Sequence, residues 1–165
     1  MYTLWLMPDK ATYLKLSKLI AELSTTHDAP SFEPHVTLLS GIVDDLGTAV
    51  NKTKQFAESL TSITARLTRI EFLEYYYRCL FFRTDESPAL MKAREEAENF
   101  FDHTHIHPFI PHVSFLYGSL PVFQKEAIVS DLGAAFLVDF RLTKLRLVKT
   151  QRTPEHWELI KEYTL

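Results

Sequence analysis

Two short segments of the chain carry the same pair of chemically active side chains, a histidine followed two positions later by a hydroxyl. The first is His35-x-Thr37 and the second is His112-x-Ser114, which begins 77 residues further along. Both segments are apolar and β-branched enough to be strands, in which residues two apart lie on the same face. Each pair is therefore expected to present an imidazole and a hydroxyl to one side of a sheet.

The two segments belong to a longer internal repeat. Residues 34–41 (PHVTLLSG) align with residues 111–118 (PHVSFLYG), with proline, histidine, valine, one leucine and glycine identical. Each copy is preceded by a predicted strand, helix and polar loop, and is followed by a predicted helix and strand. Because motif and flanks agree, we interpret the chain as two similar lobes related by a pseudo-two-fold axis.

Hydrophobic periodicity and turn residues place the remaining elements. Strands are predicted at residues 2–7, 35–39, 63–70, 72–83 (which could hold a turn), 112–117, 137–149 and 156–163. Helices are predicted at residues 9–23, 45–60, 87–101 and 121–132. The predicted fold class is α+β, with two pseudo-symmetric lobes of antiparallel β-sheet, helices on the outer faces, and a single domain over residues 1–165.

A pseudo-two-fold axis would bring His35, Thr37, His112 and Ser114 to one cleft. Two imidazoles that titrate near neutral pH can divide proton transfer between them, one as base and one as acid. The hydroxyls can donate to non-bridging phosphate oxygens, where negative charge gathers in the transition state. This combination suits in-line displacement at phosphorus without a metal ion.

Composition restricts the partners. The 165 residues carry 18 Lys and Arg against 21 Asp and Glu, a net charge of −3, which argues against a duplex nucleic acid partner. The single cysteine, Cys79, excludes a disulfide within the chain, and we expect it in the core. His103, His105 and His107 alternate in a loop, but we expect no metal or cofactor there. Without a signal peptide or membrane span, we expect a cytoplasmic monomer.

The paired motifs His35-Val36-Thr37 and His112-Val113-Ser114 resemble the two signatures of the 2H phosphoesterases, which share the LigT-like fold. Within that superfamily the chain is most similar to the cyclic phosphodiesterases of plants and fungi. The resemblance extends along the whole chain. It includes the first strand (residues 2–8), Tyr117 three residues after Ser114, and residues 147–150 followed by Trp157.

The resemblance implies a cyclic phosphodiesterase that needs no cofactor. Its substrates would be small cyclic phosphate nucleotides. ADP-ribose 1″,2″-cyclic phosphate, a by-product of tRNA splicing, would be opened to the 1″-phosphate, and nucleoside 2′,3′-cyclic phosphates to 2′-phosphates. The resemblance also implies that His35, Thr37, His112 and Ser114 are catalytic and that Tyr117 lines the substrate site. It favours His112 as the base and His35 as the acid.

Two other functions compete with this interpretation. A 2′-5′ RNA ligase-like enzyme that processes RNA ends would need to hold a polynucleotide, for which the chain has no long basic stripe. A non-catalytic module that binds phosphorylated ends would not need all four motif side chains, yet all four are present. Whether Trp5, Tyr77 or Arg78 contacts the substrate is left open by the sequence.

Overall fold

The computed structural model describes residues 1–103, 108–133 and 136–165. Within these ranges the strands are β1 (Tyr2–Pro8), β2 (Val36–Ile42), β3 (Ile63–Glu71), β4 (Leu80–Thr84), β5 (His112–Leu116), β6 (Asp139–Lys149) and β7 (Glu158–Thr164). The helices are α1 (Lys10–Thr26), α2 (Leu46–Ser59), α3 (Pro88–Phe100) and α4 (Val122–Leu132). Short 3-10 turns lie at Tyr76–Arg78 and Pro154–His156.

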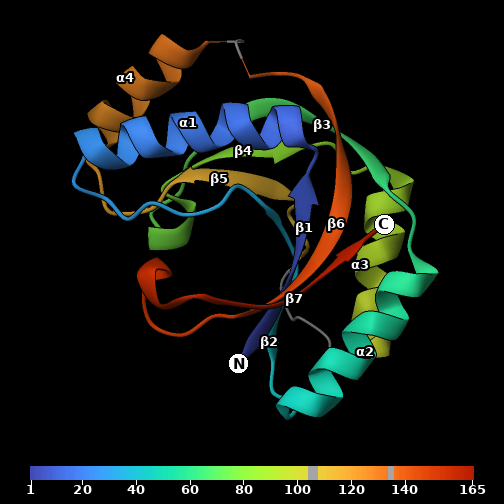
Figure 1. The fold of residues 1–165 in the computed structure, drawn as a ribbon. Helices are drawn as coiled ribbons and strands as arrows, with labels where there is room; N and C mark the ends of the chain where they lie inside the picture. Colours follow the sequence, from blue (N-terminus) through green and yellow to red (C-terminus); the bar gives the residue numbers. More distant parts are fainter. Residues whose placement is uncertain (104–107, 134–135) are drawn as a thin grey trace.

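All strand pairings are antiparallel, and six of the strands pair in a closed cycle. The order runs β1-β2-β5-β4-β3-β6 and returns to β1, while β7 adds to β6. The long strand β6 joins the two halves of the molecule (Figure 1). Its first residues pair with β3 and its later residues pair with β1 and β7.

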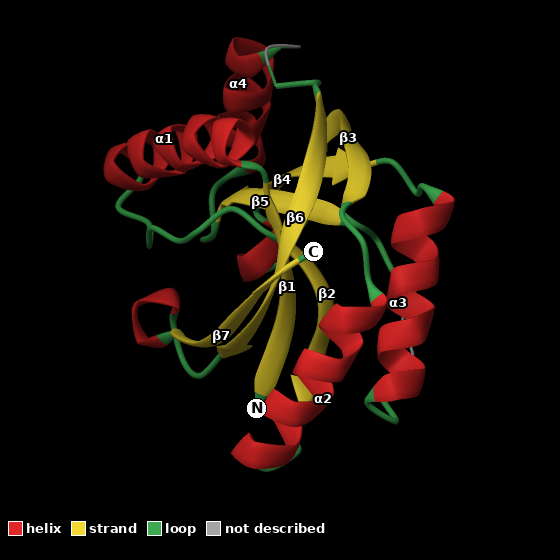
Figure 2. Ribbon diagram, turned by 45° about the vertical axis from the view of Figure 1, so that its right-hand side comes forward, coloured by secondary structure: helices red, strands yellow, loops and turns green. Residues whose placement is uncertain are grey.

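The order β1-α1-β2-α2-β3 is repeated as β4-α3-β5-α4-β6, which confirms the predicted pseudo-symmetric lobes. Strands β2 and β5 meet where Val36 lies opposite Val113, and these valines occupy the same position in the two motifs. Packing follows the same symmetry, because α1 packs on β5 and α3 packs on β2. Figure 2 shows α1 beside α4 on one side of the strands, and α2 beside α3 on the other.

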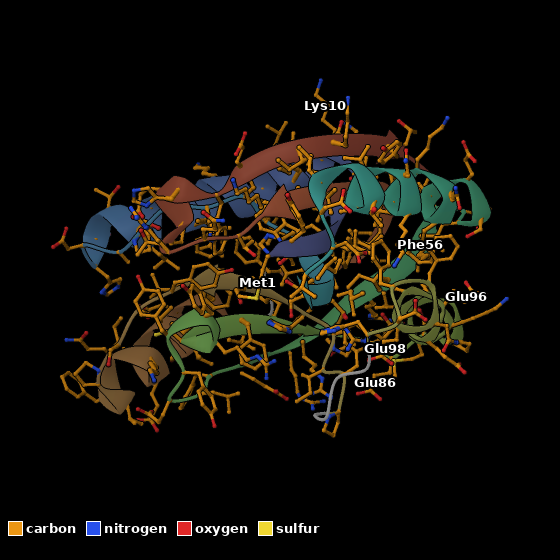
Figure 3. The ribbon with its side chains drawn as sticks, turned by 90° about the horizontal axis from the view of Figure 1, so that it is seen from below. Met1, Lys10, Phe56, Glu86, Glu96 and Glu98 are labelled. Carbon is orange, nitrogen blue, oxygen red and sulfur yellow. The ribbon has the colours of Figure 1, made fainter. Side chains whose placement is uncertain are left out.

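The helices begin where their sequences provide a capping side chain. Asp9 accepts a hydrogen bond from the Thr12 backbone N–H at 3.1 Å, and Asp45 caps α2 in the same way. Ser87 caps α3, whose first residue is a proline. The apolar faces of the helices then close the core. Phe56 of α2, labelled in Figure 3, is one such residue, and its ring centroid lies 5.8 Å from that of Phe100 of α3.

The predicted strand at residues 72–83 is wrong in its first part. Only Leu80–Thr84 is a strand, and the chain before it forms a loop with a 3-10 turn. The backbone of this loop bonds to β5 and its neighbourhood: the Tyr77 carbonyl accepts from Ser114, and the Tyr76 carbonyl accepts from the Gly118 N–H. No helix in the described part of the chain is long and apolar enough to cross a membrane.

Candidate active site

A cleft of about 420 Å³ opens between the two halves of the molecule. Residues of β1, β2 and β5 line it together with the 3-10 turn before β4 and the segment after β6. All five residues that the motifs and the resemblance indicated lie on it, namely His35, Thr37, His112, Ser114 and Tyr117. Met1 also lines the cleft and lies between the two layers of ribbon in Figure 3.

Both histidines are held by the backbone in the same way. Nδ1 of His35 lies 2.7 Å from the Glu33 carbonyl oxygen, and Nδ1 of His112 lies 2.7 Å from the Ile110 carbonyl oxygen. A carbonyl oxygen only accepts, so each neutral ring carries its proton on Nδ1 and donates it. The lone pair of each Nε2 is therefore available to a group bound in the cleft.

Burial keeps both imidazoles neutral in the unliganded cleft. It lowers the pKa of His35 to about 4, against the opposing effect of the Glu33 carbonyl, and repulsion by His112 lowers it further. Burial also lowers the pKa of His112 to about 4, opposed by the Ile110 carbonyl and assisted by the charge of Arg78. At neutral pH each ring is a proton acceptor until an anion binds.

The two hydroxyls differ in their hydrogen bonds. Ser114 Oγ donates to the Tyr77 carbonyl at 3.0 Å, which ties β5 to the 3-10 turn. Thr37 Oγ1 has no hydrogen-bond partner among the residues that the structure describes, and the side chain is half-buried. Thr37 can thus donate to a bound phosphate directly, whereas Ser114 must first release the carbonyl.

Four aromatic side chains form a wall on one side of the cleft, which we call the aromatic wall: Trp5, Tyr77, Tyr117 and Trp157. Trp157 meets Trp5 edge-on at 5.4 Å, and Tyr117 meets Tyr77 edge-on at 5.2 Å. Burial raises the pKa of the Tyr117 hydroxyl, so this residue remains uncharged. The wall offers apolar area to a flat or ring-shaped group.

The sequence did not indicate several other residues of the cleft. Thr3 and Thr150 line it, and their hydroxyl oxygens lie 2.8 Å apart. Thr3 precedes Trp5 by two positions and so shares its strand face, a signal that alternation provides. Arg152 lies in the irregular segment after β6, where periodicity gives no signal. Arg78, left open by the sequence, lines the cleft as well.

The other candidates lie outside the cleft or outside the described residues. Cys79 is fully buried, as expected for a core position. Among residues 1–103, 108–133 and 136–165, no group of three or more His, Cys, Asp or Glu side chains could hold a metal ion. His105 and His107 lie outside the described residues.

Solved structures with a similar fold include a phosphoesterase and the LigT protein. The TT0787 protein of Thermus thermophilus aligns with a TM-score of 0.66 and 13% identity, covering 99% of this chain and 97% of that one. The LigT protein of E. coli, complexed with 3′-AMP, aligns with a TM-score of 0.64 and 11% identity over the same shares of the two chains. These likenesses show that the chain has the fold of the LigT-type proteins.

The family follows from the sequence. A family model described as cyclic phosphodiesterase-like protein matches residues 1–165, so the chain belongs to this family. It is also similar to the cyclic phosphodiesterase of Arabidopsis thaliana, with 28% identity over 169 residues, 96% of this chain and 92% of that protein. The chain is thus a phosphodiesterase of the kind that hydrolyses cyclic phosphates.

Proposed function

We propose that the enzyme opens ADP-ribose 1″,2″-cyclic phosphate to ADP-ribose 1″-phosphate, and nucleoside 2′,3′-cyclic phosphates to nucleoside 2′-phosphates, without a metal ion. The observation that carries this proposal is the matched pair of imidazoles. His35 and His112 line one cleft. Each donates a hydrogen bond from Nδ1 to a backbone carbonyl, so the lone pair of Nε2 is available to the ligand.

The mechanism divides the two proton transfers between the two rings. The base takes a proton from water as the water oxygen forms its bond to phosphorus. The bond from phosphorus to the 3′ oxygen breaks, and the acid protonates that oxygen, so a 2′-phosphate and a 3′-hydroxyl result. The resemblance favours His112 as the base and His35 as the acid.

Substrate binding favours the protonated imidazole that the acid step requires. Both imidazoles are neutral at pH 7 because burial lowers their pKa values. A phosphate anion placed between them favours the protonated form of one ring and so raises its pKa. Thr37 donates to a non-bridging oxygen, which gains negative charge in the transition state.

The aromatic wall provides the place for the base of a nucleoside 2′,3′-cyclic phosphate. Stacking on such side chains is tolerant of base identity, because each base has a π-face. The LigT protein, which shares the fold, has been crystallised with 3′-AMP and with ATP. These complexes support a cleft of this fold as a site for a small nucleotide.

Chelator-treated protein offered a panel of cyclic phosphates tests the proposal. We expect hydrolysis in excess EDTA, with phosphorus NMR identifying the 2′-phosphate as product. Replacing His35 or His112 by Ala should each lower kcat by about 10²- to 10⁴-fold. The matched control is His156→Ala, which removes an exposed imidazole outside the cleft. Activity restored only by a divalent metal would exclude the two-histidine mechanism.

A further inference from the structure

Beyond Thr37 and His112 the cleft continues into a smaller hollow of about 180 Å³, which we call the side hollow. Four residues line both the cleft and the side hollow, namely Thr37, Ser40, Arg78 and His112. Four others line the side hollow but not the cleft, among them Arg94 and Phe109. We propose that the side hollow binds a phosphate group carried on the 5′ oxygen of the substrate's ribose, with Arg78 as its main contact. This inference rests on the proposed function.

Arg78 is the cation at the junction of cleft and side hollow. It is half-buried, and its guanidinium has no hydrogen-bond or ion-pair partner among the residues described by the structure. Other partly buried arginines do have carboxylate partners: Arg83 pairs with Glu86, and Arg146 pairs with Glu33. A partly desolvated guanidinium without a carboxylate is suited to an anionic ligand, which its planar donors can bind in bidentate fashion.

The backbone holds Arg78 in this place. Its N–H donates to the Tyr75 carbonyl at 2.9 Å, and its own carbonyl accepts from the Leu73 N–H at 3.0 Å. Lys125 of α4, fully buried, donates from Nζ to the Leu73 carbonyl at 3.1 Å. The position of Arg78 is thus fixed by the fold, while its side chain is left for a ligand.

Arg94 supplies an independent observation on the lining of the side hollow. The residue is 7% exposed, its Nη1 donates to the Leu38 carbonyl, and its Nη2 lies 2.6 Å from Glu98. Its Nε is buried and has no hydrogen-bond partner in the described part of the chain. Arg94 therefore adds a second positive charge at the wall of the hollow, which favours an anion there. Glu98, labelled on α3 in Figure 3, balances only one of the two guanidinium charges.

The chemistry of the ribose explains why a 5′ phosphate would reach this end. Consider the cyclic phosphate placed at the two histidines. The base is attached to the ribose at C1′, next to C2′, and the 5′ carbon is attached at C4′, next to C3′. The two substituents therefore extend from opposite sides of the reacting group. A base on the aromatic wall therefore directs the 5′ oxygen away from the wall. The side hollow, which none of the four wall residues lines, is in a position to receive it.

Such a subsite would discriminate between substrates that have the same cyclic phosphate but differ in the 5′ substituent. A nucleoside 2′,3′-cyclic phosphate has a 5′ hydroxyl, so it places no anion in the side hollow. ADP-ribose 1″,2″-cyclic phosphate has a diphosphate at the corresponding oxygen of its ribose, and an RNA fragment with a cyclic phosphate end has a phosphodiester there. The side hollow would favour the phosphorylated compounds from either source.

The test compares kcat/KM for uridine 2′,3′-cyclic phosphate with kcat/KM for its 5′-phosphorylated form. We expect the wild-type enzyme to prefer the phosphorylated form, and Arg78→Met to lower the ratio by about ten- to a hundredfold. Arg78→Lys should restore part of the ratio because it restores the charge. Arg66→Met is the control, since Arg66 is exposed on β3, outside the cleft, and its loss changes the net charge equally.

The outcomes are distinct. An unchanged ratio in Arg78→Met overturns the proposal, whether both substrates slow equally or neither does. A ratio lowered by Arg152→Met instead would place the 5′ phosphate at the other rim and also overturn it. Two further substrates show which phosphorylated compound the side hollow favours: ADP-ribose 1″,2″-cyclic phosphate and a dinucleotide that ends in a 2′,3′-cyclic phosphate. The proposal requires that Arg78→Met lowers kcat/KM for at least one of them.

A binding measurement separates this inference from the proposed function. Calorimetry should show that adenosine 2′,5′-bisphosphate binds more tightly than adenosine 2′-phosphate, and that Arg78→Met removes the difference. If uridine 2′,3′-cyclic phosphate is not hydrolysed but this difference is seen, the proposed function fails and the subsite stands. If it is hydrolysed and the two adenosine phosphates bind equally, the subsite fails alone.

Discussion

Trp5 and His35 lie face to face, with ring centroids 3.7 Å apart and an angle of 12° between the planes. Strand register produces this contact, because Trp5 of β1 lies opposite Thr37 and so shares the face on which His35 lies. The indole removes the imidazole from water, and both rings are almost fully buried. It also fixes the plane of the ring, and with it the direction of Nε2.

The second half of the molecule repeats this arrangement with a smaller ring. Phe81 of β4 lies opposite Ser114, as Trp5 lies opposite Thr37. Its ring meets His112 edge-on, with centroids 5.1 Å apart, and His112 is the more exposed of the two histidines. The lobes are thus symmetric in backbone and motif, while the aromatic ring against each imidazole differs.

We predict that Trp5→Ala raises the pKa of His35 toward the ordinary value of imidazole. Burial is the largest cause of its depression, and the indole supplies part of that burial. Histidine ring signals followed by NMR through a pH titration measure the change. Trp5→Phe, which keeps a ring against His35, is the control. A pKa unaltered by Trp5→Ala would show that other neighbours desolvate the ring.

We predict different pH optima for kcat/KM and kcat. In the free enzyme both histidines have pKa values of about 4, so the form with one protonated ring is most abundant near that pH and declines above it. The kcat/KM profile, which reports the free enzyme, should therefore peak below pH 6. In the complex the phosphate anion raises the pKa values, which shifts the optimum of kcat to higher pH.

Initial rates from pH 4 to pH 9 with a nucleoside 2′,3′-cyclic phosphate provide both profiles. A maximum of kcat/KM above pH 7 would contradict the lowered pKa values. The residual rates of His35→Asn and His112→Asn then assign the roles. Loss of the base flattens the acidic limb of the profile, and loss of the acid flattens the alkaline limb.

The same pKa values predict that the protein loses stability as the pH falls below 6.5. Folded imidazoles with pKa values of about 4 stay neutral where unfolded ones bind protons, so between pH 6.5 and 4 the unfolded chain binds more protons. The free energy of unfolding should fall across this window by on the order of a few kcal/mol. Urea unfolding at several pH values measures it.

Replacing His35 by Gln removes one of the two groups and should reduce the slope in this window. The exposed His156→Gln is the control for removing an imidazole as such. Bound inorganic phosphate should also flatten the dependence, because it favours the protonated rings in the folded state. A slope unaffected by His35→Gln would argue against this residue as a source of the pH dependence.

The repeat made the fold predictable. Residues 34–41 and 111–118 match in sequence and flanks, and alternation along a strand is a local property that indicates which residues share a face. The meeting of Val36 and Val113 confirms that the two motifs lie side by side. Cap residues such as Asp9 and Ser87 likewise indicate helix starts within a residue or two, because the hydrogen bonds that they make are local.

The parts that could not be predicted depend on contacts between distant residues. The aromatic content of residues 72–83 is typical of a strand, but the Tyr77 carbonyl accepts from Ser114, 37 residues away. Arg94 of α3, which lines the side hollow, donates to the Leu38 carbonyl on β2, 56 residues away. No pattern within a short window contains such pairs, so the loop and the second arginine were not indicated.

We predict that the two hydroxyl substitutions have different consequences, because only Ser114 supports the fold. Ser114→Ala leaves the Tyr77 carbonyl without its donor, which should lower the free energy of unfolding by about 1 kcal/mol and raise KM by loosening the turn that positions Tyr77 and Arg78. Thr37→Ala removes a hydroxyl without a partner among the described residues, so stability should be unchanged while kcat falls by about tenfold. Thermal unfolding and steady-state kinetics on both variants measure these effects, with Thr37→Ser as the variant that keeps the hydroxyl. Equal losses of stability in the two alanine variants would show that the bond from Ser114 to the Tyr77 carbonyl does not hold the turn.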